Sequence, residues 1–286
     1  MAYKVLNNVS VKDVTSSDLL SLKTDLLVIV INKNTKDKVV NQLAKDVSSH
    51  LKESGSSVLV PNAKSFNAKN VLLVKGFQDS DQIHKLISMY QSIAQKGNQL
   101  KAKDISIMPG TVYPKGKCEM WLIEMVAKTI ESNVYIFSET CNKTAKKPSV
   151  KKLNILVSSL TKSDLIKAKN AAKKGYAIGE GVNSAKYLGD LPANHCTPRI
   201  IEKKVKAMTK DFPKLKVKSF NENQMKKMGM GSFLSVSRGS EEPARMMVIE
   251  YKGGKSSEKP VALVGKGVTF DTGGVSIKPS PAMDEM

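Results

Sequence analysis

The segment that decides the fold lies near the end of the chain and reads Pro260-Val-Ala-Leu-Val-Gly-Lys-Gly-Val-Thr-Phe-Asp-Thr-Gly-Gly-Val-Ser-Ile-Lys278. Its apolar beginning, residues 260–264, is typical of a strand that is buried in a sheet. The rest is rich in glycine, which lets the backbone turn tightly and approach a ligand or an ion closely. This turn presents the carboxylate of Asp271 between Lys266 and Lys278. The pattern indicates a loop that holds a metal ligand and a fixed cation at the end of a sheet.

The residue types leave the chemistry of this loop open. Beside Phe270, the carboxylate of Asp271 would lie in partly apolar surroundings, where burial disfavours its charged form. A metal ion or a nearby lysine would offset that cost. Lys266 and Lys278 could each be a counter-ion, an electrophile or, when neutral, a metal ligand.

Two common phosphate-binding motifs are absent from the sequence. The segment does not match the phosphate loop Gly-x-x-x-x-Gly-Lys-Ser/Thr, because no Gly-Lys-Ser/Thr occurs within residues 260–278. Gly265-Lys-Gly267 is too short for a dinucleotide fingerprint, which requires Gly-x-Gly-x-x-Gly at the start of a helix. Spacing alone therefore allows an anion site, a metal site or an ordinary glycine-rich turn.

The segment Val264–Pro279 resembles the metal-site signature of the leucyl aminopeptidase family, the cytosol aminopeptidases. Two upstream segments, Ala185–Asn194 and Met230–Ser240, resemble the same family and occur in the expected order. The resemblance covers the chain from about residue 175 onward. Over residues 1–160 it rests on α/β character and position.

The resemblance implies a metal-dependent aminopeptidase that releases N-terminal residues, preferably leucine or other apolar ones, from peptides. In the family, two divalent ions, Mn²⁺ or Zn²⁺, activate a water molecule. When the family pattern is carried over to the matching positions of this chain, the resemblance implies that Lys266 and Asp271 are metal ligands, with Asp271 bridging both ions. It implies that Lys278 is catalytic, because its ammonium group polarises the scissile carbonyl and stabilises the gem-diolate.

The chain departs from the family pattern at its end. The family's next metal ligand would fall just beyond Met286, and its later ligands and arginine would follow. We therefore expect a chain that is truncated within the catalytic domain and inactive alone. The family forms homohexamers through that domain, and we do not expect this chain to do so.

The order of apolar segments predicts an α/β fold. Strand-like runs occur at residues 26–31, 71–74, 104–108, 134–137 and 154–157, with helix-like segments between several of them. They predict an N-terminal α/β domain of macro-like type with a mixed sheet over residues 1–160. A capping box at Thr161-Lys-Ser-Asp164 begins a connecting helix over residues 161–190.

Residues 191–286 are predicted to form an incomplete α/β catalytic domain. Its expected strands are residues 215–220, 245–251 and 260–264. The last two of these could pair as a hairpin or lie side by side.

The charge of the chain supports a second hypothesis. The net charge is +20, so a non-catalytic basic protein that contacts nucleic acid or a protein partner is an alternative. Of the 46 basic residues, however, only Arg199, Arg238 and Arg245 are arginine. Proteins that read bases usually rely on arginine for bidentate contacts to guanine, so the lysine excess argues against this class.

Composition also predicts the compartment. The three cysteines are widely spaced, which is typical of reduced thiols in a cytosolic protein. No run of 18 or more apolar residues occurs, so no transmembrane helix is expected. The first residues lack the basic start and apolar stretch of a signal peptide. We therefore expect a cytoplasmic protein with no membrane partner.

Overall fold

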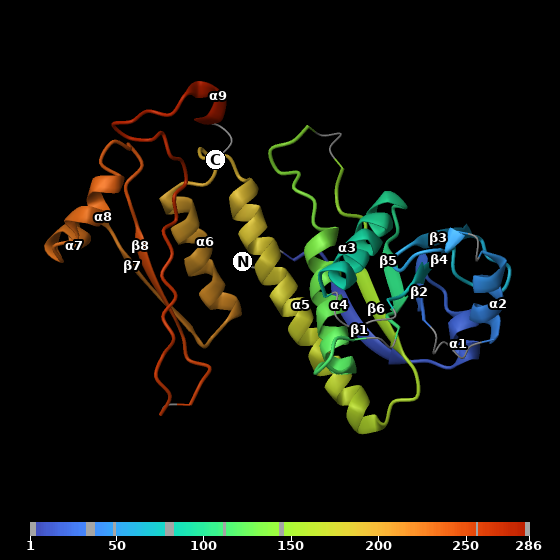
Figure 1. Cartoon of the computed structure of the whole chain (residues 1–286). Coiled ribbons are helices and arrows are strands. Elements are labelled where there is room, and N and C mark those ends of the chain that lie inside the picture. Colours follow the sequence, from blue (N-terminus) through green and yellow to red (C-terminus); the bar gives the residue numbers. More distant parts are fainter. Residues whose placement is uncertain are drawn as a thin grey trace. The chain divides into compact units, whose positions relative to one another are not determined.

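The computed structural model describes residues 4–32, 38–47, 50–77, 83–110, 113–142, 146–255 and 257–283. The chain forms two compact units, Ala2–Tyr187 and Leu188–Met286. Figure 1 shows their helices and strands. The mixture of strands and helices confirms the predicted α/β class.

The first unit alternates strands and helices along the chain. Its elements are β1 (Asn8–Asp13), α1 (Ser16–Ser21), β2 (Leu26–Ile31), α2 (Lys38–Asp46), β3 (Ser57–Pro61), β4 (Asn70–Lys75), α3 (Ile83–Gln99), β5 (Asp104–Met108), α4 (Glu119–Val134), β6 (Lys152–Val157) and α5 (Lys162–Asp190). The strands form one six-stranded sheet in the order β1-β6-β5-β2-β4-β3. β3 runs antiparallel to β4, and the other neighbouring strands are parallel. The predicted mixed sheet is therefore confirmed.

The central strand β2 is the most apolar of the sheet. It reads Leu-Leu-Val-Ile-Val-Ile, and its first five side chains are buried. It pairs in parallel with β4 on one side and β5 on the other, so that Val28 lies between Leu72 and Ile107. A continuous apolar run is expected of a parallel strand because helices cover both faces of the sheet.

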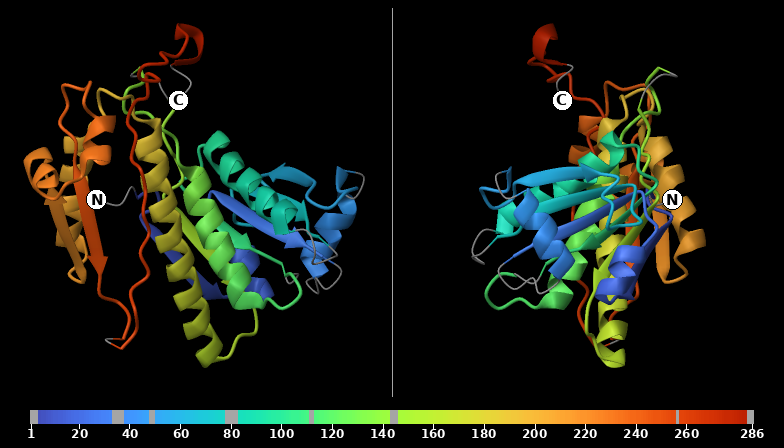
Figure 2. Two further views of the ribbon diagram at one scale, coloured as in Figure 1. Left: turned by 60° about the vertical axis from the view of Figure 1, so that its left-hand side comes forward. Right: turned by 90° about the vertical axis from the view of Figure 1, so that its right-hand side faces the viewer.

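Each face of the sheet has its own core. On one face, residues of α3, α4 and α5 pack against the strands, with Tyr90, Ile123 and Ala172 among them. On the other face, Leu19 of α1 and Val40 of α2 pack against the alternate strand residues. Figure 2 shows the three longer helices lying along one side of the sheet.

The helix α5 packs closely on α4 through small residues. Its buried positions recur at helical spacing and are Ala168, Ala172, Gly175, Gly179, Asn183 and Tyr187. A Cβ atom added at Gly175 would lie 2.0 Å from the carbonyl oxygen of Glu124. The helix ends at Asp190 and so leads the chain from the first unit into the second.

The strand predicted at residues 134–137 is wrong. Val134 is the last residue of α4, where it continues the buried stripe of Ile130, and residues 135–138 have no regular structure. The segment lies along the end of α5 instead. There the hydroxyl of Tyr187 donates to Glu139, and the ammonium group of Lys186 lies 5.9 Å from the ring centre of Tyr135. The helical period of the buried side chains prevailed over a β-branched and aromatic run that resembles a strand.

The second unit contains less regular structure. Its elements are α6 (Pro198–Asp211), β7 (Leu215–Phe220), α7 (Glu222–Lys227), α8 (Gly231–Val236), β8 (Met246–Tyr251) and α9 (Ser280–Met283). β7 and β8 form an antiparallel pair, which confirms two of the three strands expected there. Thr197 caps α6 by accepting from the N–H of Ile200, and Pro198 occupies the first turn.

The third strand expected in this unit, residues 260–264, is wrong. The segment has no strand structure, and its apolar side chains are almost fully exposed, with Val261 at 89%, Leu263 at 94% and Val264 at 99%. A strand forms only where a neighbour supplies ladder hydrogen bonds. Within the parts of the chain that the structure describes, no strand pairs with this segment.

Candidate metal and catalytic site

The charged loop from Gly265 to Pro279 is organised around Asp271. The Oδ1 atom of Asp271 accepts a hydrogen bond from the backbone N–H of Gly273 at 2.9 Å. Its Oδ2 atom accepts one from the Nζ atom of Lys278 at 3.1 Å. The main chain closes the same loop, because the N–H of Lys278 donates to the carbonyl oxygen of Thr272 at 2.9 Å. Each carboxylate oxygen of Asp271 therefore has a donor within the loop.

Gly273 makes this turn possible. Its φ of +88° lies in the region that favours glycine, as does the φ of +63° at Gly274. A Cβ atom at Gly273 would lie 2.2 Å from the carbonyl oxygen of Ser276 and 3.0 Å from the Cγ atom of Lys278. The predicted tight glycine turn is confirmed, and the lysine stem lies directly over the glycine.

The electrostatic surroundings keep Asp271 ionised. The N–H of Gly273 and then the hydrogen bond and charge of Lys278 hold its pKa below the ordinary value, and the charge of Lys266 acts in the same direction. The surroundings of the carboxylate are open to solvent, because the Asp271 side chain is 53% exposed and Phe270 is 49% exposed. Burial therefore has little effect on this carboxyl group.

The three predicted site residues are not placed alike. Asp271 and Lys278 are in direct contact. Lys266 is exposed and acts on Asp271 through its charge alone. The loop thus brings together one carboxylate and one ammonium group, with a second positive charge nearby.

The donor set at this loop does not fit a complete two-metal centre. Two divalent ions require several carboxylates to balance their charge. Over the described ranges, no group of three or more His, Cys, Asp or Glu side chains could hold a metal ion. At the loop itself, the single carboxylate of Asp271 faces the ammonium groups of Lys266 and Lys278. These residues supply at most part of such a centre.

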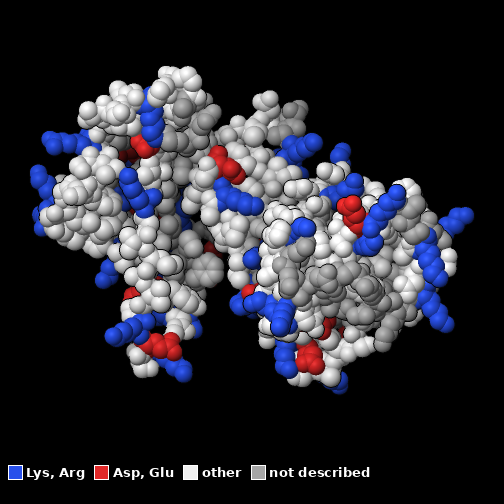
Figure 3. Space-filling model, in the orientation of Figure 1, with Lys and Arg blue, Asp and Glu red and all other residues white. Residues whose placement is uncertain are grey.

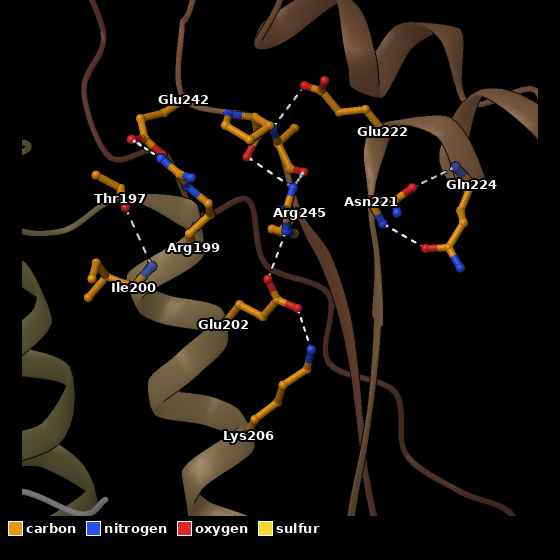
Figure 4. Close-up of polar contacts among 12 residues, drawn as sticks. Thr197, Arg199, Ile200, Glu202, Lys206, Asn221, Glu222, Gln224, Glu242 and Arg245 are labelled. Atoms are coloured by element: carbon orange, nitrogen blue, oxygen red, sulfur yellow. Dashed lines mark hydrogen bonds and ion pairs between the residues drawn. The ribbon is translucent and has the colours of Figure 1, made fainter.

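A second polar cluster was not predicted from the sequence. Arg199 forms a bidentate pair with Glu242, at 2.9 and 2.7 Å. Arg245 donates to Glu202 at 2.8 Å, and the other oxygen of that carboxylate accepts from Lys206 at 2.5 Å. Figure 4 shows that the cluster joins α6 to the loop before β8. Two of the three arginines in this lysine-rich chain lie in the cluster. Arginine forms planar bidentate pairs with carboxylates, which lysine cannot. The rare arginines were therefore the sequence signal that could have located the cluster.

Comparisons with known proteins agree on one family. The model of the "Cytosol aminopeptidase family, catalytic domain" matches residues 183–286, which include all three predicted site residues. A probable cytosol aminopeptidase of Pseudomonas fluorescens is 34% identical over 281 residues, covering 93% of this chain and 55% of that protein. A cytosol aminopeptidase of Pseudomonas aeruginosa is 32% identical, covering 93% of this chain and 56% of that protein.

The chain belongs to the cytosol aminopeptidase family. The family resemblance inferred from the sequence is therefore confirmed. This member of the cytosol aminopeptidase family spans about half the length of the curated relatives that it matches.

A solved structure supports the fold of this cytosol aminopeptidase family member. A mutant of tomato leucine aminopeptidase matches it with a TM-score of 0.74 and 22% sequence identity, covering 95% of this chain and 56% of that one. At this identity the match concerns the fold alone. Among the residues described, no helix is long and apolar enough to cross a membrane.

Proposed function

We propose that the protein acts in a metal-dependent aminopeptidase reaction, releasing N-terminal residues, preferably leucine and other apolar ones, from peptides. One observation carries the proposal. An ionised carboxylate, Asp271, lies 3.1 Å from the ammonium group of Lys278, inside the segment 183–286 that matches the family's catalytic domain. A fixed carboxylate and a fixed cation in one loop are suited to peptide hydrolysis assisted by a cation.

Asp271 and Lys266 are the proposed metal ligands of this chain. The ionised carboxylate of Asp271 suits a divalent cation, and Lys266 could bind one only when neutral. The bound ions are proposed to be Mn²⁺ or Zn²⁺. In support, a solved bottromycin maturation enzyme, 21% identical to this chain, is described as a complex with Mn. Because the loop holds one carboxylate, we expect the 286-residue chain to be inactive by itself.

Lys278 is proposed to act on the substrate. A fixed ammonium group stabilises the negative charge that develops on the oxygen of the scissile carbonyl. Because Lys278 donates to Asp271 at 3.1 Å, we expect a peptide carbonyl that contacts Lys278 to bind close to the same carboxylate. Lys278 is therefore the catalytic residue of the proposal.

The cellular setting and domain roles are proposed on the same basis. The relatives carry the name cytosol aminopeptidase, which supports a cytoplasmic protein that acts on peptides. We assign residues 191–286 to the catalytic domain, residues 1–160 to a separate N-terminal domain and residues 161–190 to the connecting helix.

A chimera tests the function. In it, this chain replaces the matching part of the Pseudomonas fluorescens relative, and hydrolysis of leucine p-nitroanilide is measured with Mn²⁺ or Zn²⁺. We expect the chimera to be active and the chain alone to be inactive. Asp271→Asn and Lys278→Met should each lower the chimera's kcat by about 100-fold or more. Lys259→Met removes the same charge from an exposed position and should leave activity unchanged.

Two results would contradict the proposal. One is a chimera that is folded by circular dichroism but hydrolyses no substrate. The other is an Asp271→Asn chimera with undiminished kcat. Turnover by the chain alone at a rate close to that of the chimera would refute the expected inactivity.

The face of the molecule drawn in Figure 3 gives no support to the nucleic-acid alternative. On the face drawn in Figure 3, Lys and Arg side chains are scattered, with Asp and Glu between them, and they do not gather into one stripe. A basic stripe or patch is the usual footprint of a phosphate-binding surface.

A further inference from the structure

The segment 260–264 combines exposed apolar side chains with an unpaired backbone. Val261 is 89% exposed, Leu263 is 94% exposed and Val264 is 99% exposed. Over the residues that the structure describes, no hydrogen bond joins the backbone of this segment to another backbone group. Figure 1 shows it within the irregular stretch between β8 and α9. An apolar run whose N–H and C=O groups are unpaired is a template for pairing with another strand.

The sequence of this segment suits antiparallel pairing with a second copy of itself. When Ala262 lies on the two-fold axis of such a pair, Val261 faces the partner's Leu263 and Pro260 faces the partner's Val264. Successive side chains of a strand alternate between its faces, so Val261 and Leu263 of both copies gather on one face. Each copy thereby covers apolar side chains that are almost fully exposed in the single chain.

The flanking charges select this register. With Ala262 on the axis, Glu258 faces the partner's Lys266, and symmetry repeats the pair. Both side chains are exposed, and the Glu258 carboxylate accepts one long hydrogen bond, from the N–H of Lys255 at 3.4 Å. A shift of one residue would instead place Lys259 opposite Lys266. Opposite charges that face each other across two strands stabilise the pair, whereas like charges destabilise it.

Pro260 explains why the pairing closes at two copies. In this register Val261 and Leu263 direct their N–H and C=O groups toward the partner, and Pro260 lies at a pair that forms no ladder hydrogen bonds. The missing N–H of Pro260 therefore costs nothing at this edge. At the opposite edge of the same strand, Pro260 would fall at a hydrogen-bonded pair and interrupt the ladder. A third copy is therefore disfavoured.

We propose that residues 258–266 are a self-association segment, through which two copies of the chain form an antiparallel strand pair centred on Ala262. The proposal goes beyond the aminopeptidase function and requires neither a metal ion nor a peptide. A short strand pair is a small interface, so the dimer forms at high concentration and dissociates on dilution. The net charge of +20 opposes association, but at ~0.15 M salt charges more than about 8 Å apart are largely screened.

Sedimentation equilibrium of the full chain at ~0.15 M salt tests the proposal by measuring the Kd of the dimer. Glu258→Lys places like charges opposite each other at both symmetry-related pairs, and so does Lys266→Glu. We expect each change to raise the Kd about tenfold. Glu241→Lys alters the net charge as much as Glu258→Lys does, at an exposed position outside the segment, and should leave the Kd unchanged.

Exchanging the charges tests the register itself. The double variant Glu258→Lys/Lys266→Glu restores opposite charges at both pairs, so its Kd should return to the wild-type value. An equimolar mixture of the two single variants should form a heterodimer for the same reason. Leu263→Asp should abolish pairing, and because Leu263 is 94% exposed, its loss removes no packing within the chain. Circular dichroism checks that each variant is folded.

Each part of the proposal has its own contrary result. A wild-type chain that stays monomeric at every concentration would refute self-association. If the charge variants change the Kd no more than Glu241→Lys does, or if the mixture forms no heterodimer, the register is refuted. Growth of the wild type into species larger than a dimer would refute closure by Pro260. The aminopeptidase proposal is unaffected by these outcomes, because none of them measures hydrolysis.

Discussion

Glu131 shows how a single residue can connect distant parts of the first unit. Its side chain has no exposed surface, and its carboxylate accepts hydrogen bonds from the backbone N–H groups of Val5 and Leu6, each at 3.0 Å. The Nδ2 atom of Asn183 on α5 donates to it at 3.0 Å as well. Burial raises the pKa of Glu131, and these donors act against that effect. One carboxylate therefore joins α4, α5 and the segment that leads into β1.

Glu131→Gln should destabilise the first unit. The amide keeps the size of the side chain but replaces one acceptor oxygen with an NH₂ group, so at least one of Val5 and Leu6 loses its acceptor. An unsatisfied buried N–H costs about 2 kcal/mol. Urea unfolding should show this loss, whereas Glu53→Gln at an exposed position should change stability little. Equal stability of the Glu131→Gln and wild-type chains would refute this account.

Glu202 makes the second unit sensitive to acid. The hydrogen bond from Lys206, with a smaller contribution from that of Arg245, lowers the pKa of Glu202 to about 2, below its ordinary value of 4.5. A carboxyl group with a depressed folded pKa stabilises the fold above its unfolded pKa, and that contribution is lost as the pH falls through the folded pKa. The second unit should therefore lose stability between about pH 4.5 and about pH 2.

Thermal unfolding at several pH values within this window checks the prediction. Glu202→Gln should lower the Tm at neutral pH and should flatten the decline of Tm with acid. Glu241→Gln, at an exposed position, is the matched control and should keep the wild-type slope. An unchanged acid slope in Glu202→Gln would show that other groups cause it.

Two glycines of helix α5 have different surroundings and therefore different structural roles. Gly175 lies against α4, where an added Cβ atom would meet the backbone of Glu124 at 2.0 Å. Gly181 lies on the same helix with no atom within 4 Å of such a Cβ. The same residue type therefore serves close packing at one position and only lowers helix propensity at the other.

Gly175→Ala and Gly181→Ala should have opposite effects on stability. The first forces α5 away from α4 and should cost about 2 kcal/mol. The second should stabilise by about 0.5–1 kcal/mol, because alanine favours a helix. Chemical denaturation of both variants measures the difference. A stabilising Gly175→Ala would mean that the two helices are not in such close contact.

Some elements were predictable because their signals are local. The buried run of β2 and the caps Thr161 and Thr197 are recognisable within a few residues, and the structure bears them out. The strands expected at 134–137 and 260–264 were wrong because a strand depends on a neighbour distant in sequence. In the first segment, Val134 belongs to α4 and the following residues to the loop after it. The second segment pairs with no strand in the described part of the chain.

Over the whole molecule, apolar burial is unevenly distributed. The first unit has a core on each face of its sheet. In the described residues of the second unit, the buried apolar side chains are Leu191, Cys196, Met225 and Ala244. Because buried apolar area is the main source of stability, the second unit should open more readily than the first.

Limited proteolysis tests this difference. A brief digestion with thermolysin should remove residues beyond about 188 and leave a resistant fragment that corresponds to Ala2–Tyr187. The exposed apolar segment 260–264 should be cut early, because such sites suit that protease and lack regular structure. Fragment masses give the cut sites. Loss of both units at the same rate would contradict the prediction.

The sequence by itself determined the family, the α/β class and the residues of the charged loop, because these depend on short motifs and local periodicity. Only the tertiary structure decided which partners meet. It paired Lys278 rather than Lys266 with Asp271, left that carboxylate half exposed, and brought two arginines onto glutamates between α6 and the loop before β8. The physical reason is that ion pairs and sheet ladders join residues according to distance in the fold, which the spacing of residues along the chain does not specify.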